Sequence, residues 1–281
     1  MKQLLASVII AMLMLPVLAE GANFRFQKIR GGVYAALAEP GGKAASNCLI
    51  VVTDYQVILA GAHFVPETTK EILDYIKKIT PLQVRYIILT HHHRGFNYID
   101  FDLPANAEII ASGQTWQALK GEFRQIKNQV TFFDRGLTLK RGKTLIIMSN
   151  TEFGHSEGDV FVYLPEERVL FTSDLFFNNV AGYMGDGHFR DWISTLGLLA
   201  DIDASSVVPG LGEVTNSAGI LKFQAFFLDF TTEMLRLIGK GLTPEVAQRQ
   251  FSLPQYESLP GFRAFYDVNF KRAYTEIKDA K

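Results

Sequence analysis

Imidazole and carboxylate side chains follow apolar, strand-like runs at three separate places in this chain. Three consecutive histidines, His91 to His93, come directly after the run VRYIILT. His155 lies in the glycine-flanked loop GHSEGD before another apolar run, and Asp174 follows the run VLFTS. Because side chains alternate on an extended backbone, His91 and His93 point to one side and the middle histidine points to the other. The chain is therefore expected to bring several strand ends together, and these residue types predict a metal site there.

Short strands and helices alternate through two successive halves of the chain. Apolar runs predict strands at 24–29, 33–38, 48–53, 56–60, 84–89, 108–111, 130–133, 137–140, 144–148, 159–164, 169–172 and 206–208. Helical spacing predicts helices at 67–79, 114–127 and 191–200, and a helical tail at about 217–281 with breaks near 240–241 and 253–260. The apolar stripe of this tail, which includes Phe223, Phe226, Phe227, Phe230 and Leu235, is expected to be core. We expect one compact domain in which helices cover mixed sheets.

The first 19 residues, MKQLLASVIIAMLMLPVLA, form a separate segment. Lys2 precedes an apolar run that is shorter than the roughly 20 residues of a membrane span, and Val17-Leu18-Ala19 fits a cleavage site. We expect a signal peptide at 1–19 that is cleaved after Ala19, and hence a periplasmic or secreted protein. The alternative is an uncleaved anchor. No membrane span is expected after removal of the signal.

Charge and cysteine content exclude several classes of protein. The chain has 28 Lys and Arg against 29 Asp and Glu, so it has no basic field for a phosphate backbone, and nucleic acid is not expected as a partner. A single cysteine, Cys48, excludes an intramolecular disulfide and a cysteine-rich zinc finger. Cys48 lies in an apolar run and is expected to be buried and inert.

The motifs THHH, GHSEGD, VLFTSDL and VVPGLGEVT occur in this order, and together they resemble the metallo-β-lactamase superfamily. The usual motifs of that family are T-H-x-H-x-D-H, G-H-[ST], F-[TS]-[GS]-D and P-G-H-G. The resemblance implies an α+β fold, the four-layer αββα sandwich, as a single domain over 20–281 with a C-terminal helical tail. It also implies a metal site of His91, His93 and His155, with Asp174 as the carboxylate that bridges two ions in the family.

Four positions depart from the family pattern. Gly95 and Phe96 replace the Asp and His that follow the H-x-H pair, Leu211 replaces the His of P-G-H-G, and Ala60 replaces a family acid. The second metal site has thus lost its own ligands, so the sequence predicts one divalent metal, most simply zinc. If His91, His93, His155 and Asp174 all bound this zinc, its tetrahedral shell would be full.

Iron is the alternative metal. His91, His155 and Asp174 match the two-histidine, one-carboxylate arrangement of mononuclear non-haem iron enzymes.

The resemblance implies a metal-dependent hydrolase that acts on a small-molecule ester, thioester, lactone or amide. Metal-bound water would be the nucleophile, and Asp174 is the one side chain considered for a catalytic role. The alternative is a catalytically degenerate protein that keeps the fold to bind a ligand or a protein partner.

Five further residues are candidates for substrate binding: His63, Arg94, Tyr183, Asp186 and His188. His63 could instead be an acid–base group, a substitute metal ligand or an ordinary loop histidine. Arg94 would meet an anionic substrate.

Overall fold

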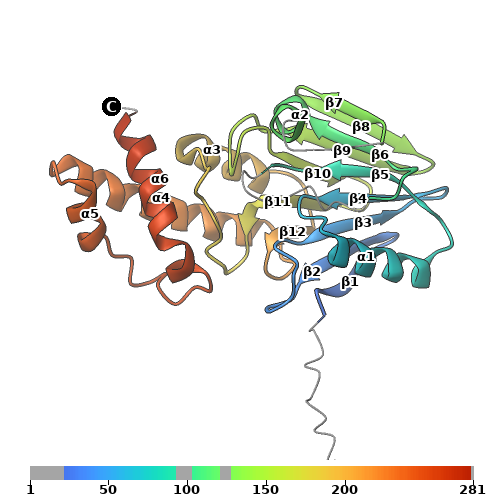
Figure 1. The fold of residues 1–281 in the computed structure, drawn as a ribbon, viewed down its shortest axis with the longest axis horizontal. Helices are drawn as coiled ribbons and strands as arrows, with labels where there is room; N and C mark the ends of the chain where they lie inside the picture. The colour runs from blue at the N-terminus through green and yellow to red at the C-terminus, as the bar shows by residue number, and fades with distance from the viewer. Residues whose placement is uncertain (1–21, 93–102, 121–127, 280–281) are drawn as a thin grey trace, which may run out of the picture.

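The strands form two sheets (Figure 1). The computed structural model describes residues 22–92, 103–120 and 128–279, so the predicted signal peptide lies outside the described residues. Within these ranges, the first sheet contains β1 (Phe24–Arg30), β2 (Val33–Ala38), β3 (Cys48–Val52), β4 (Val57–Gly61), β5 (Val84–Leu89), β6 (Glu108–Ser112) and β7 (Val130–Phe133), in that order. The second sheet has the order β12-β11-β10-β9-β8, with β8 (Gly136–Arg141), β9 (Thr144–Asn150), β10 (Val160–Leu164), β11 (Val169–Phe177) and β12 (Ser206–Leu211).

Helices cover the outer faces of both sheets, and three apolar cores separate the layers. The helices are α1 (Pro66–Ile79), α2 (Gly113–Lys120), α3 (Phe189–Ala200), α4 (Ser217–Gly239), α5 (Pro244–Gln250) and α6 (Phe262–Asp279). One core joins α1 and α2 to the first sheet, a second fills the space between the sheets, and a third joins the C-terminal helices to the second sheet. The predicted αββα architecture with its C-terminal helices is confirmed.

Helix α1 shows how the sequence specifies one of these layers. Pro66 stands at its first turn, where a missing N–H costs nothing, and Glu67 lies at the positive end of the helix dipole. Thr68, Ile72 and Ile76 recur at helical spacing and are buried against the first sheet.

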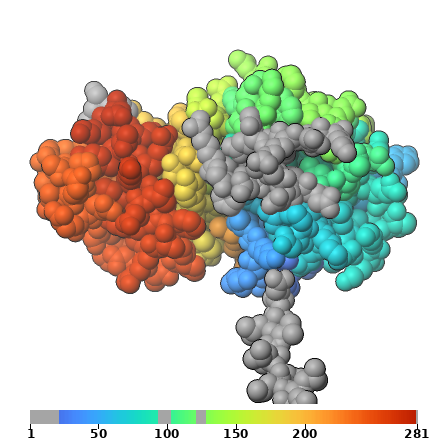
Figure 2. All heavy atoms as spheres, in the orientation of Figure 1, coloured from blue at the N-terminus to red at the C-terminus, as the bar shows by residue number. Residues whose placement is uncertain are grey.

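The helical tail forms its own aromatic core. Phe223, Phe226, Phe227 and Phe230 of α4 are buried among α3, α6 and β11, as the sequence predicts. The prediction is wrong for Leu235, which keeps 38% of its surface exposed because it lies on the opposite side of the helix. Figure 2 shows the C-terminal helices as a lobe beside the sheets. None of the helices in the described ranges is long and apolar enough to span a membrane.

Two strands extend further than their sequence indicates. β11 continues through Asp174 to Phe177, and β12 continues through Pro209 to Leu211. β12 is the edge strand of its sheet, next to β11, and a proline is tolerated there because no further strand of the sheet needs its N–H. The main-chain N–H of Asn47 donates to the Gly210 carbonyl at 2.7 Å, which joins the first sheet to this edge.

The Asn47 side chain completes this link between the sheets. It is fully buried; its amide nitrogen donates to the carbonyls of Pro209 and Gly212 at 2.9 and 3.0 Å, and its oxygen accepts from the Ala38 N–H at 2.8 Å. Each of these three partners belongs to the main chain, so the contact depends little on other side chains. A single residue thus satisfies backbone groups of both sheets.

We expect Asn47→Ala to lower the free energy of unfolding by about 2–4 kcal/mol, because it leaves buried backbone groups without hydrogen bonds. Urea denaturation measures this change. The matched control is Asn178→Ala, which removes a similar bond to the Glu213 carbonyl at an exposed position and should change stability by less than about 0.5 kcal/mol. Equal effects of the two substitutions would show that Asn47 does not link the sheets.

Candidate metal centre

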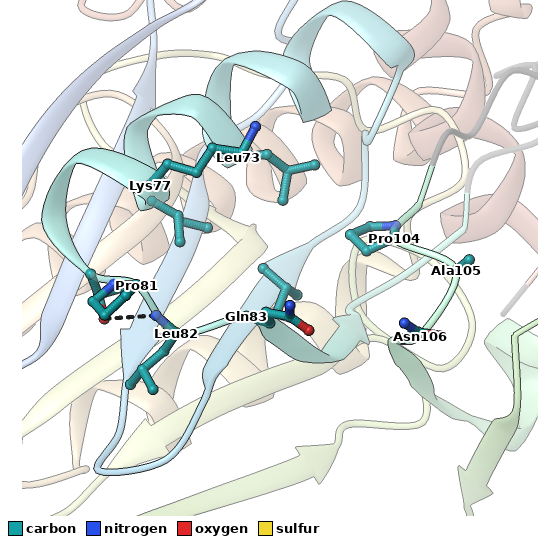
Figure 3. A pocket seen from close by; sticks show the side chains of 11 residues that line it. Leu73, Lys77, Pro81, Leu82, Gln83, Pro104, Ala105 and Asn106 are labelled. Carbon is teal, nitrogen blue, oxygen red and sulfur yellow. Dashed lines mark hydrogen bonds between the residues drawn. The ribbon is translucent and has the colours of Figure 1, made fainter.

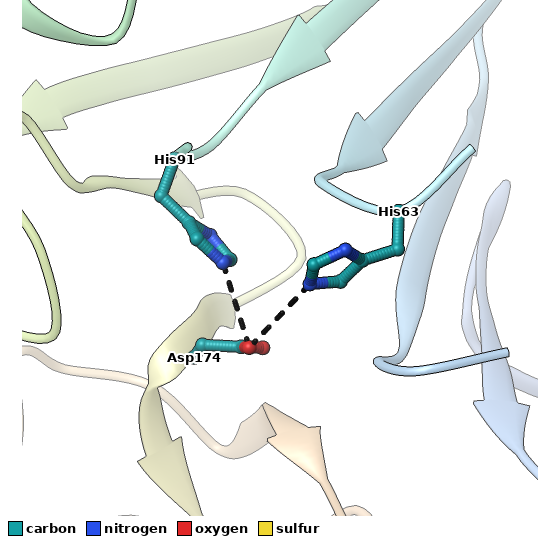
Figure 4. A group of neighbouring side chains, drawn as sticks. All are labelled: His63, His91 and Asp174. Carbon is teal, nitrogen blue, oxygen red and sulfur yellow. Dashed lines mark ion pairs between the residues drawn. The ribbon is translucent and has the colours of Figure 1, made fainter. Parts of the chain in front are cut away.

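Four side chains from four strand ends or loops converge at one edge of the sandwich. His63 follows β4, His91 follows β5, His155 lies in the loop between β9 and β10, and Asp174 lies within β11. The Nε2 atoms of His91, His155 and His63 lie 3.5, 3.6 and 3.9 Å from Oδ2 of Asp174. Figure 4 shows His63 and His91 pointing at this carboxylate. β4 and β5 are parallel neighbours, so their carboxyl ends, with the two histidines, lie at the same edge.

The spacing of these atoms suits a bound metal ion. A tetrahedral ion with bonds of about 2.0–2.2 Å holds its donor atoms roughly 3.3–3.6 Å apart. Donor atoms of His63, His91 and Asp174 all lie within 4.8 Å of one another. The distances to Oδ2 are at or beyond the long end of N–H···O hydrogen bonds, which favour about 2.7–3.2 Å. All four side chains are buried. The donors that share this mutual spacing, two imidazoles and one carboxylate, fit a divalent ion, and His155 approaches them through its 3.6 Å contact with Oδ2.

Electrostatic interactions in the cluster favour the metal-binding protonation states of His91 and Asp174. Burial lowers the pKa of the His91 imidazole, and the Asp174 carboxylate opposes this effect only in part. Burial alone would raise the pKa of the Asp174 carboxyl, but interactions with His91, His63 and His155 together hold it well below its usual range. A neutral imidazole and an ionised carboxylate are the forms that bind metal.

The backbone around Asp174 is shaped to present its carboxylate. Ser173 has a φ of +48°, in the left-handed region that residues other than glycine rarely adopt. A Cβ atom at Gly210 would lie 2.3 Å from Oδ1 of Asp174, so only glycine lets β12 pass this close. Local strain and close packing of this kind gather at functional sites.

Two hydroxyl groups fix the orientation of His91. Its Nδ1 lies 3.2 Å from Oγ1 of Thr90 and 3.5 Å from Oγ of Ser173, and the two hydroxyls are 2.8 Å apart. With Nδ1 on the hydroxyl side, Nε2 faces Asp174. Such outer partners orient metal-binding histidines and tune their affinity.

The loop that carries His155 is fixed by its own hydrogen bonds. The Asp159 carboxylate accepts from the Ser156 N–H at 2.9 Å and from the Ser156 hydroxyl at 2.6 Å. The Gly158 carbonyl accepts from the hydroxyls of Ser112 and Thr115, at 2.6 and 3.1 Å. His155 is thereby positioned by contacts with the first sheet and with the start of α2.

An aromatic wall surrounds the His155 ring. The ring centroids of Trp192, Phe177 and Tyr183 lie 5.2, 5.7 and 6.4 Å from that of His155, each in an edge-on arrangement. The Trp192 indole donates to the Leu175 carbonyl at 2.7 Å, which holds it in place. This wall limits the rotation of His155 and gives one side of the centre an apolar surface.

The structure brings together three of the four predicted metal ligands: His91, His155 and Asp174. The fourth, His93, lies outside the described residues, as does the candidate substrate residue Arg94. His63, a candidate for substrate binding or for a substitute metal ligand, points at Asp174. The signal that could have identified it is its position directly after an all-buried strand whose parallel neighbour leads to His91.

The remaining candidate substrate residues lie near the aromatic wall. Tyr183 contacts His155 edge-on, and its hydroxyl is 3.4 Å from Oδ2 of Asp186. The ring of His188 packs on Phe153 at 4.7 Å, at the start of α3. Burial lowers the pKa of His188, and Arg272 lowers it further.

Residues that replace polar family residues lie in apolar surroundings. Ala60 is buried in the core between the sheets, and Leu211 packs against the core of the helical tail. Gly95 and Phe96 lie outside the described residues. Neither of the two described positions supplies a donor atom to a second ion.

A separate surface pocket of about 400 Å³ lies at the opposite end of β5 (Figure 3). The C-terminal end of α1, residues 80–84 and residues 104–106 line it. Since it lies at the amino end of the strand and the candidate metal centre at the carboxyl end, the two are distinct.

Comparisons with known proteins agree with this architecture. A sequence model of the family described as ODP family beta lactamase matches residues 44–192, more than half of the chain. A metallo-beta-lactamase type 2 from Bacillus sp. (strain 170) is 24% identical over 207 residues, which cover 67% of this chain and 76% of that protein. A nitric oxide reductase from Moorella thermoacetica is 23% identical over 116 residues, which cover 40% of this chain but only 29% of the reductase.

Solved structures share the fold. A metallo-beta-lactamase from Pontibacter korlensis has a TM-score of 0.63 and 22% identity, covering 73% of this chain and 99% of that one. The DIM-1 metallo-beta-lactamase has a TM-score of 0.61 and 19% identity, covering 74% of this chain and 98% of that one. The superfamily resemblance drawn from the motifs is confirmed.

We expect Thr90→Val to weaken metal binding by about 10–100-fold, because it removes a hydroxyl that orients His91. Competition with a chromogenic chelator measures this affinity. Thr131→Val is the matched control, because the Thr131 hydroxyl donates to Glu108 on the first sheet at 2.5 Å and contacts no residue of the centre. An unchanged affinity in Thr90→Val would show that the hydroxyl pair does not position the imidazole.

Proposed function

This chain belongs to the ODP family of beta lactamases, and we propose that it is a hydrolase dependent on one divalent metal held by His91, His155 and Asp174, with His63 and His93 as the further candidate donors. The observation that carries the proposal is the convergence of three imidazole Nε2 atoms, at 3.5–3.9 Å, on one buried carboxylate. A metal there would act as a Lewis acid toward a substrate carbonyl and would lower the pKa of water.

The protein side chains supply position and charge. Asp174 contributes the negative charge, and the histidines contribute imidazole donors from both sheets. His91 is oriented by Thr90, and the rotation of His155 is limited by the aromatic wall. Groups held in this way need little reorganisation when a substrate enters, which is the usual source of catalytic advantage in a preorganised site.

The proposed substrate is a small molecule with an ester, thioester, lactone or amide carbonyl. Tyr183 and Trp192 offer an apolar surface beside His155, and Asp186 and His188 place polar groups near it. An apolar wall with a few polar groups is typical of small-molecule sites. Relatives named metallo-beta-lactamases make β-lactams reasonable members of a first substrate panel.

A single ion, zinc, is the proposed cofactor, and iron is the alternative. Three imidazoles and one carboxylate form a donor set common in zinc sites. The apolar surroundings of Ala60 and Leu211 support one ion over two. We also propose that the protein is periplasmic or secreted, on the strength of residues 1–19; a mature N-terminus at Glu20 would support this, and retention of Met1 would contradict it.

A second candidate function is ligand or partner binding without catalysis. The observation that favours it is the number of protein donors: four of them around one tetrahedral ion leave no open position, as in structural zinc sites. Catalytic zinc sites keep one position for water. Activity toward the substrate panel therefore separates the two functions.

We expect the purified mature protein to contain about one equivalent of divalent metal per chain, and His155→Ala to contain less than about a tenth of an equivalent, because the centre loses a fully buried donor. Elemental analysis measures the metal, and circular dichroism checks that the variant is folded. Hydrolysis of a chromogenic ester, thioester or β-lactam should stop on chelation and return with zinc. One equivalent of metal without hydrolysis would favour the binding function, and no metal after zinc reconstitution would contradict the hydrolase and leave binding of a ligand or partner without a metal.

We expect His63→Ala to weaken metal binding by at least about 100-fold, more than the loss of an outer partner, because His63 is proposed to bind the ion directly. Chelator competition on the folded variant measures the affinity. His188→Ala is the matched control: it removes an imidazole from the rim of the site and should leave the affinity unchanged. If His63→Ala bound metal like the wild type, His63 would not be a ligand.

A further inference from the structure

Helix α4 carries an apolar stripe on its exposed face. Leu221, Leu228 and Leu235 are 51%, 47% and 38% exposed, although the phenylalanines of the same helix are buried. Successive leucines are seven residues apart. Ala225 and Thr232 each lie four residues after one leucine and three residues before the next. This is the heptad spacing of a coiled-coil seam, and the leucines span roughly 21 Å along the helix.

Charged residues border one side of this stripe, one position after each leucine. Lys222 donates to the amide oxygen of Asn179 at 2.7 Å, and Asp229 accepts from the Tyr256 hydroxyl at 2.7 Å. Within the described ranges, neither residue has an oppositely charged partner. Arg236 differs, because it already pairs with Glu233 of the same helix.

We propose that the stripe binds the same stripe of a second copy of this chain, with the two α4 helices antiparallel. A two-fold axis near residues 226 and 227 places Leu228 of each copy against the small Ala225 of the other. It also places Leu221 against Thr232. Large side chains thus meet small ones in each layer, as close helix packing requires.

Charge complementarity selects this alignment. In an antiparallel helix pair, the residues on the same side of the apolar stripe in the two copies lie next to each other. Lys222 of each copy therefore faces Asp229 of the other, and this ion pair forms twice. A shift by one heptad would place Asp229 against Asp229 and Lys222 against Arg236, which is repulsive. A parallel pair would place Lys222 beside Ser217 and Asp229 beside Gln224, which are neutral.

The test is sedimentation velocity of the mature protein, with its metal, from about 1 to 200 μM at low salt. The wild type should change from monomer to dimer over this range. Leu228→Lys, Lys222→Glu and Asp229→Lys should each weaken dimerisation by at least about tenfold, because each introduces a buried or opposed charge. The double variant Lys222→Glu/Asp229→Lys should regain dimerisation to within about threefold of the wild type.

Two controls make the result specific. Tyr55→Lys changes another exposed apolar residue, 72% exposed and between β3 and β4, and should dimerise like the wild type. Ala225→Cys should not form a disulfide-linked dimer, since each Ala225 faces Leu228 of the other copy and not its own equivalent. A wild type that stays monomeric at 200 μM, a double variant that fails to recover, or a crosslinked Ala225→Cys dimer would overturn the proposal. Thermal unfolding of each variant verifies that it is folded.

Discussion

The buried carboxylate of Asp174 is the feature on which the rest of the structure depends. An ionised group in an apolar interior is costly unless opposite charges or donors surround it. Here three imidazoles provide that surrounding, and they arrive from loops of both sheets. The left-handed conformation of Ser173 and the absence of a side chain at Gly210 serve the same group. The arrangement of the candidate metal centre therefore follows from the need to accommodate one buried charge.

The fit between the two sheets is fixed close to this charge. Asn47 hydrogen-bonds to the carbonyls of Pro209 and Gly212, on either side of the glycine that contacts Asp174. A shift of β12 away from the first sheet would break these bonds and move Gly210 off the carboxylate. The stability of the sandwich and the geometry of the candidate centre are thus coupled, because both depend on the same few backbone groups of β12 and the residue that follows it.

The sequence predicts most of this because strand ends carry the chemistry. The runs before His91, His155 and Asp174 are apolar enough to identify strands, and parallel pairing brings two of the strand ends together. The position of His63 after β4 places it at the same edge as His91, but the backbone turn after β4 decides whether its ring points at Asp174, so the sequence leaves its role open. The sequence does not indicate that β12 extends through Pro209, because proline usually ends a strand. An edge strand such as β12 tolerates it. Leu235 was misassigned to the core because a helix of 23 residues that is apolar on two faces gives no sign of which face the fold covers.

The position of His63 bears on whether the centre is a remnant. If the lost acid at Ala60 and the lost ligand at Leu211 reflected decay alone, the remaining histidines would need only to neutralise Asp174, and direct hydrogen bonds of about 2.7–3.2 Å would do so best. The observed Nε2 to Oδ2 distances of 3.5–3.9 Å give up part of that stabilisation. Two of these distances, 3.5 and 3.6 Å, equal the separation of donor atoms around a tetrahedral ion. His63 also lies only three residues after Ala60, which replaces the family acid, and it points into the same edge of the sandwich. This geometry favours a centre that has been rearranged around one metal over one that has been abandoned.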